Sequence, residues 1–197
     1  MAKINKKSLI SIMNNKVAPI ANRELSNRIR KSVDSAQEQM MEEFNMHPVT
    51  QEIEGGPNGY NQSGTLGGYG NLFSYIGFEE GMSPTEPLRR VLKKILKIRA
   101  VPANHKSMVM KFLVEIPSKE ELFAAAPMPW ANGRSWAEGI EKGISGLGQY
   151  LNTTSFVSRS GEGVQAKNQI RSGKFLNTKY LSSILNNLKR NIRQGIK

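Results

Sequence analysis

The longest periodic segment of the chain runs from about Val17 to Met46, where apolar residues recur every three or four positions. These apolar positions are Leu25, Ile29, Val33, Ala36, Met40 and Phe44. The spacing predicts an amphipathic helix with one buried face. Because Pro48 disfavours helical geometry in the residue before it, we expect this helix to end at Asn45–His47.

Four later segments also predict helices. Ser83 with Glu86 forms a capping box with Pro84 at the first helical position, and the apolar period continues to about Arg99. Ser118 caps a short helix that stops before Pro127. The other two helices begin at Ser135 and at about Asn177, and their apolar faces are Trp136, Ile140, Ile144, Leu147 and Leu151 in one and Tyr180, Leu181, Ile184, Leu185, Leu188 and Ile192 in the other.

One strand is clear, and one long segment predicts an arm. Ser107–Ile116 alternates apolar and polar residues, which is the period of a strand. In Pro48–Phe78, two runs that favour strand flank eight glycines between Gly55 and Gly77, so we expect a long hairpin or an extended arm. The hypothesis is that this arm becomes ordered against a neighbouring subunit through Tyr60, Tyr69, Leu72, Phe73, Tyr75 and Phe78.

These elements together predict an α+β fold, with amphipathic helices around a small antiparallel sheet. Residues 1–16 are expected to be a flexible basic arm. Residues 17–175 are expected to form the α+β domain, which includes the glycine-rich arm. Residues 176–197 are expected to form a basic amphipathic helix. No apolar run reaches the roughly 20 residues that span a membrane, so no membrane contact is expected.

Charge is segregated along the chain, which carries a net charge of +12. Residues 1–31 contain eight Lys or Arg and one Glu, whereas residues 32–87 contain nine acids and no Lys or Arg. Residues 88–119 and 151–197 are basic again. Such blocks indicate either separate surfaces for a polyanion and a basic partner, or pairing of the blocks within one molecule. The sequence leaves both interpretations open.

The densest basic face lies on the helix predicted to follow Ser83, and a second lies on the last helix. The residues that could contact a DNA channel or a partner are Arg89, Arg90, Lys93, Lys94, Lys97, Lys189, Arg190 and Arg193. Contact with phosphates or with an acidic protein surface is one interpretation, and a solvated helix face is the other.

Candidate chemistry is sparse in this sequence. There is no cysteine, which excludes disulfides and thiolate metal sites. His47 lies near Glu42 and Glu43, but no second half of a metal site follows, and a capping or surface role is favoured. His105 shares no motif with His47. The expectation is a protein without enzymatic activity, cofactor or bound metal.

The order of elements carries a family resemblance over residues 20–175. The segments that carry it are Asn45–Thr50, Gln51–Glu54, Gly67–Phe73, Ile76–Phe78, Pro129–Tyr150 and Ser158–Gln165. The first four segments, in this order, resemble the small neck and tail-completion proteins of tailed bacteriophages, and the last two are similar to virion proteins of contractile-tailed phages. The resemblance implies an α+β virion protein that is assembled in the host cytoplasm as a sixfold or twelvefold ring. Such a ring would join head and tail, contact other neck or tail proteins, and surround the DNA channel.

Two other classes of function compete with this expectation. A nucleic-acid-binding protein that acts free in the cell would bind DNA tightly and without sequence preference, with a steep dependence on salt. A nuclease would need a cluster of acids for metal ions, and Glu79, Glu80 and Glu86 are too loosely placed to supply one.

Overall fold

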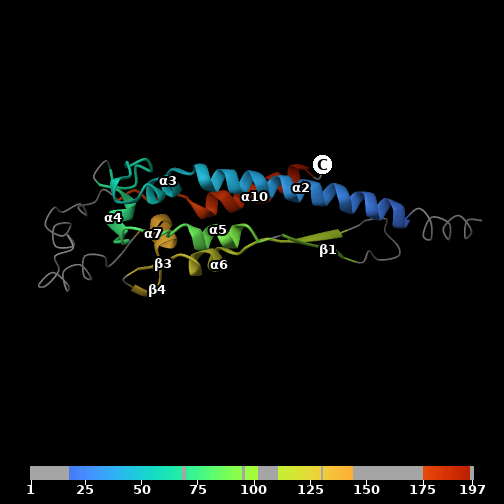
Figure 1. Ribbon diagram of the computed structural model, residues 1–197. Helices are drawn as coiled ribbons and strands as arrows, with labels where there is room; N and C mark the ends of the chain where they lie inside the picture. Colours follow the sequence, from blue (N-terminus) through green and yellow to red (C-terminus); the bar gives the residue numbers. More distant parts are fainter. Residues whose placement is uncertain are drawn as a thin grey trace, which may run out of the picture.

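The computed structural model describes residues 18–67, 70–94, 96–101, 111–129, 131–143 and 175–195. They form an elongated α+β body in which a long helix, α2 (Ala18–Met46), runs along one side (Figure 1). The predicted fold class is therefore confirmed. The expected basic arm at residues 1–16 and the turn at Ser158–Gln165 lie outside the described residues.

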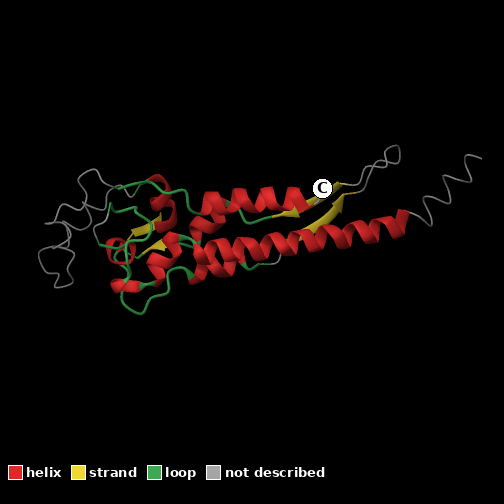
Figure 2. Cartoon of the chain, turned by 90° about the horizontal axis from the view of Figure 1, so that it is seen from above, coloured by secondary structure: helices red, strands yellow, loops and turns green. Residues whose placement is uncertain are grey.

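Helix α2 lies antiparallel to the last helix, α10 (Leu181–Gly195), and the two run side by side in Figures 1 and 2. The Asn187 side-chain amide donates to Glu43 at 2.6 Å, and that of Asn191 donates to Gln39 at 2.9 Å. The apolar face predicted for α2 is buried from Ile29 to Phe44, and α10 buries the face predicted for the last helix. Both amphipathic helices are thus confirmed.

Beneath α2 lie two short helices and a hairpin (Figure 1). These elements are α5 (Glu86–Leu92), β1 (Lys97–Val101), β2 (Lys111–Glu115) and α6 (Lys119–Ala124). The antiparallel strands pair Lys97 with Glu115 and Ile98 with Val114. The strand prediction is confirmed for the described residues 111–115, whereas 107–110 lie outside them.

The helix predicted to reach Arg99 ends instead at Leu92, and that part of the prediction was wrong. The chain turns at Lys93 and Lys94, and Lys97 and Arg99 belong to β1. The strand β2 supplies a ladder of backbone hydrogen bonds for this segment, and Ile98 packs against the core from the strand. The helix also begins two residues later than predicted: Thr85, not Ser83, is the cap residue, and its side chain makes no cap hydrogen bond.

The far end of the body gathers α3 (Pro48–Glu54), the 3-10 helix η2 (Gly56–Asn58), α4 (Leu72–Ile76), β3 (Pro127–Met128), β4 (Ala131–Ser135) and α7 (Trp136–Lys142). The strands β3 and β4 pair antiparallel and were not predicted. Ser118 and Ser135 cap α6 and α7 as expected, because each hydroxyl accepts a hydrogen bond from the backbone N–H three residues later. Residues 144–151 of the helix predicted from Ser135 lie outside the described residues.

The hairpin or arm predicted for Pro48–Phe78 is wrong, because both of its strand-like runs are helices. His47 Nδ1 accepts from Val49 N at 3.2 Å and caps α3. Asn71 Oδ1 accepts from Ser74 N at 2.9 Å and caps α4, and Gly77 ends α4 with φ of 87°. The caps and burial of one face outweigh the strand preference of the β-branched and aromatic residues.

The aromatic residues of this segment pack against their own chain. Leu72, Phe73 and Tyr75 are buried, and the ring of Phe78 lies 6.0 Å from that of Trp136 at a right angle. They therefore do not form an exposed arm. Of the other two predicted arm residues, Tyr60 is 83% exposed, and Tyr69 lies outside the described residues.

A buried carboxylate fixes the glycine-rich loop between α3 and α4. Glu52 is fully buried, and its two oxygens accept from Ser63 N at 2.8 Å and from Leu72 N at 2.7 Å. Asn71 reinforces the closure by donating to the carbonyls of Pro57 and Gly59. Because a buried carboxylate is costly unless it is hydrogen-bonded, these contacts hold the loop in one conformation.

We expect Glu52→Gln to lower the free energy of unfolding by about 2–3 kcal/mol. The NH2 group that replaces one carboxylate oxygen would point at the backbone N–H of Ser63 or of Leu72. Two buried hydrogen-bond donors would then face each other without an acceptor. Urea unfolding followed by circular dichroism measures the change. The exposed Glu42→Gln on α2 is the control and should change stability by less than about 0.5 kcal/mol. Equal effects of the two substitutions would contradict the role assigned to Glu52.

Candidate functional site

Arg89, the first residue of the predicted basic face, is part of the internal structure. Its guanidinium forms ion pairs with Glu54 and, at 2.6 Å, with Glu86, and it donates to Asn45 at 3.3 Å. It also lies over the ring of Phe44, 5.7 Å from the centroid. The hydrogen bond from Arg89 lowers the pKa of Glu86. Arg89 therefore joins α2, α3 and α5, and its assignment to a channel surface is corrected.

The other predicted basic residues are divided among several elements. Lys94 pairs with Glu121 at 2.7 Å. Arg90, Lys93 and Lys97 are exposed and form no salt bridge with the part of the chain that the structure describes.

The three basic residues of the last helix lie elsewhere on the body. Lys189, Arg190 and Arg193 are exposed on α10. Gln37 of α2 donates to the carbonyls of Leu92 and Lys94, at the end of α5, whereas Gln39 contacts α10. The basic residues of α5 and those of α10 therefore lie beside different sides of α2.

A polar groove that the sequence did not predict lies between α2 and α10. Its volume is about 600 Å³, and the residues that line it are Arg28, Lys31, Ser32, Ser35, Ala36, Gln39, Asn191, Gln194 and Gly195. We call it the basic groove. The spacing of Arg28, Lys31 and Ser35 places them on one helical face, and this spacing was the only sign of the groove in the sequence. The residues of α10 that line the groove depend on how the two helices align, which the sequence does not reveal.

The two helices approach closely at one end of the basic groove. A Cβ atom added at Gly195 would lie 2.0 Å from Ser32 Oγ and 3.1 Å from Ser32 Cβ, so only glycine fits there without a shift. The Ser32 hydroxyl is buried and has no hydrogen-bond partner within the described residues. Arg28 and Lys31 likewise form no salt bridge with described residues.

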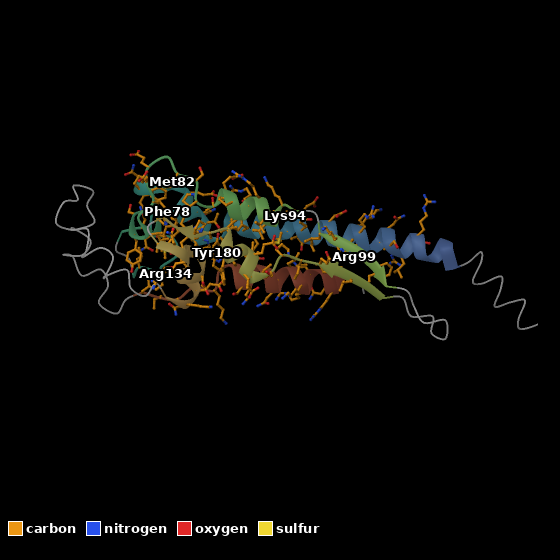
Figure 3. All side chains as sticks on the ribbon, turned by 90° about the horizontal axis from the view of Figure 1, so that it is seen from below. Phe78, Met82, Lys94, Arg99, Arg134 and Tyr180 are labelled. Carbon is orange, nitrogen blue, oxygen red and sulfur yellow. The ribbon has the colours of Figure 1, made fainter. Side chains whose placement is uncertain are left out.

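An exposed acidic turn lies at the other end of the body. It comprises Glu79–Met82, in which Met82 N donates to the Glu79 carbonyl at 3.1 Å and Gly81 has φ of 88°. We call it the acidic turn. Glu79 and Glu80 are exposed and form no salt bridge with the described residues. Figure 3 shows Met82 and Arg99 toward opposite ends of the body.

His47 has a capping role, as the sequence favoured. Its ring lies 4.8 Å from that of Tyr180, whose hydroxyl is 2.7 Å from Thr50 Oγ1. Burial lowers the pKa of His47, and Glu43 and a backbone hydrogen bond with Lys179 offset part of that shift. Burial also raises the pKa of Tyr180. No group of three or more His, Asp and Glu residues among those described is placed to hold a metal ion.

Comparisons of the chain with protein-family models, with curated proteins and with solved structures found no match. Among the helices that the structure describes, none is both long enough and apolar enough to cross a membrane.

We expect Arg89→Ala to lower the free energy of unfolding by about 1–3 kcal/mol, because it leaves Glu54 and Glu86 without their partner. Arg90→Ala is the matched control, since Arg90 is exposed on the same helix, and its effect should stay within about 0.5 kcal/mol. Chemical denaturation compares the two. If Arg90→Ala lowered the free energy of unfolding more than Arg89→Ala, Arg89 would not have the internal role assigned to it.

Protonation of His47 should destabilise the fold. Its pKa in the folded chain is below the usual value of 6.5, so the unfolded chain binds the proton more readily. The free energy of unfolding should therefore fall as the pH drops below about 6.5. The imidazolium also cannot accept from Val49 N.

The variant His47→Asn keeps a cap acceptor that does not titrate and should flatten this dependence between pH 7.5 and 5.5, even if it is less stable overall. Urea unfolding at each pH measures both chains. The same slope in the two proteins would exclude His47 as its source.

Proposed function

We propose that this chain is a structural virion protein of a tailed phage, a ring-forming subunit of the neck or tail-completion region that joins head and tail. The observation that carries the proposal is the separation of unpaired charge on an elongated body. Cations without salt bridges to the described residues line the basic groove and cover part of α10, whereas carboxylates without such salt bridges lie on the acidic turn at the far end.

This arrangement supports head-to-tail association of copies. Two different and complementary patches on one chain make heterologous contacts, which close into a ring when the rotation between copies permits. A ring of this kind needs a rigid subunit, and the single hydrophobic core that joins α2, α10, α4 and α7 supplies one. The resemblance of the sequence to neck and tail-completion proteins supports the same function.

The exposed cations also suit a DNA channel. In this proposal Arg90, Lys93 and Lys97 contact either the DNA or the adjoining ring. The basic residues of α10 contact whichever of these two the first set does not. Contact would be with phosphates, without reading of sequence.

The same cations favour a second candidate, a nucleic-acid-binding protein that acts free in the cell. The two proposals differ in what the isolated chain does. The free protein would bind duplex DNA tightly, with an affinity that falls steeply as salt is raised. A ring subunit would bind DNA weakly as a monomer and would associate with itself or with its neighbours in the particle.

We expect the triple reversal Arg90→Glu, Lys93→Glu and Lys97→Glu to block incorporation into particles while the monomer stays folded. Arg90 and Lys93 are exposed and form no salt bridge with described residues, so their reversal should change stability little. Lys97 lies opposite Glu115 on β2, so its reversal adds a like-charge pair that costs roughly 0.2–1 kcal/mol, and the melting temperature should fall by only a few degrees. Immunogold electron microscopy of particles purified from its source, with antibody against this chain, should label one fixed point on the tail axis.

The matched control reverses two exposed acids, Glu42→Lys and Glu120→Lys, which are not among the residues of the proposed contact. Normal particles that carry the triple reversal would exclude Arg90, Lys93 and Lys97 from the contact. Label absent from particles but abundant in the soluble lysate, together with tight salt-dependent DNA binding, would favour the free protein over the ring.

A further inference from the structure

We infer that the acidic turn of one copy docks into the basic groove of the next, and that this is the head-to-tail contact which builds the ring. The inference rests on the proposed function, and it names the two surfaces and the occupant of the groove. That occupant is Glu79–Met82 of a second copy of this chain.

The groove has the chemistry that carboxylates need. Arg28 and Lys31 are cations without salt bridges in the described part of the chain. A guanidinium binds a carboxylate through two parallel hydrogen bonds, and an ammonium can hold a second carboxylate as a point charge. The hydroxyl of Ser35 and the side-chain amide of Gln194 add neutral donors. A volume of about 600 Å³ lies within the range of about 300–1,000 Å³ that holds small ligands.

The acidic turn has the complementary properties. It presents two adjacent exposed carboxylates, Glu79 and Glu80, in a block of sequence from 32 to 87 that contains no Lys or Arg. The hydrogen bond from Met82 N to the Glu79 carbonyl fixes the turn, and the left-handed Gly81 lets the chain reverse there. A segment already held in its turn loses little conformational entropy on binding.

Geometry prevents the turn from filling the groove of its own molecule. The turn precedes α5, which Arg89 ties to Asn45 near the C-terminal end of α2. Ser32, at the groove, is 14 residues before Met46 in the same helix, which corresponds to ~21 Å of helix. Side chains cannot bridge that distance, so the acidic turn and the basic groove of one molecule do not pair with each other.

A phosphate backbone is the competing occupant, and the groove suits it less well. Affinity for duplex DNA grows with the number of phosphates that Lys and Arg neutralise. The basic groove offers two cations among neutral amides and hydroxyls, whereas exposed cations lie outside it on α5, β1 and α10. The neutral donors fit carboxylates and backbone groups of a protein turn.

The test removes charge from one surface at a time in the full chain. The turn variant is Glu79→Gln with Glu80→Gln, and the groove variant is Arg28→Gln with Lys31→Gln. Each should raise the Kd for self-association about tenfold or more, measured by sedimentation velocity and mass photometry over a range of concentrations. Controls of equal charge change are Glu42→Gln with Glu120→Gln and Lys119→Gln with Lys179→Gln, at exposed residues outside both surfaces, which should leave the Kd unchanged.

Mixing separates a direct contact from a general charge effect. The turn variant keeps an intact groove and the groove variant keeps an intact turn, so an equimolar mixture can form one native contact per pair and should stop at dimers. A chain that carries both reversals, Glu79→Lys with Glu80→Lys and Arg28→Glu with Lys31→Glu, restores complementarity with opposite signs and should assemble again. Circular dichroism confirms that each variant is folded.

The outcomes distinguish this inference from the proposed function. Unaltered assembly of all variants, with the native chain forming rings, would overturn the docking contact and leave the ring intact. Loss of DNA binding without change in self-association of the groove variant would make the groove a phosphate site and overturn the contact. A native chain that stays monomeric at every concentration and is absent from particles would overturn both proposals.

Discussion

The rest of the structure depends on the antiparallel contact between α2 and α10. This contact buries the apolar faces of both helices and brings together the residues that line the basic groove. The apolar face of α2 from Ile29 to Phe44 is buried together with the apolar face of α10, although well over a hundred residues separate the two helices in sequence. At about 25 cal/mol per Å² of buried apolar area, such a face is the main source of stability of a long helix, since helical propensity alone is weak. The tight approach of Gly195 to Ser32 fixes the register, and the register brings Asn191 and Gln194 beside Arg28 and Lys31.

At the other end of the body, a buried carboxylate and a partly exposed guanidinium join the elements. Glu52 holds the glycine-rich loop through two backbone N–H groups, and Arg89 joins Glu54, Glu86 and Asn45. Each leaves unsatisfied groups if its partner is removed, so each allows only one arrangement of the elements that it joins. The acidic turn begins three residues after the end of α4 and ends four residues before the start of α5. The two helices that flank it therefore hold it in place.

The elements that local periodicity and capping determine could be predicted from the sequence. The features that depend on contacts between distant segments could not. The period of α2, the alternation of residues 112–116 and the caps Ser118 and Ser135 were read correctly. The strand interpretation of Leu72–Phe78 overlooked two helix-capping signals in the sequence, Asn71 before the run and Gly77 near its end. The basic groove was beyond local analysis, because half of its lining comes from α10 in a register that only the folded chain defines. Arg89 shows the same limit, since its carboxylate partner Glu54 is 35 residues away in sequence.

The segregated charge can now be divided between internal and external roles. Two of the ion pairs join the acidic block 32–87 to Arg89, and a third joins Lys94 to Glu121. Arg99 pairs with Glu115 across the β1–β2 hairpin at 3.2 Å, and Lys142 pairs with Glu138 within α7. Ion pairs within the molecule therefore neutralise part of the charge in the middle of the sequence. None of the ion pairs among the described residues includes a cation of 18–31 or of α10. Among the described residues, the cations of 18–31 and of α10 and the carboxylates of the acidic turn form no salt bridges, and they are the charges on which the proposed contacts between copies and with polyanions depend.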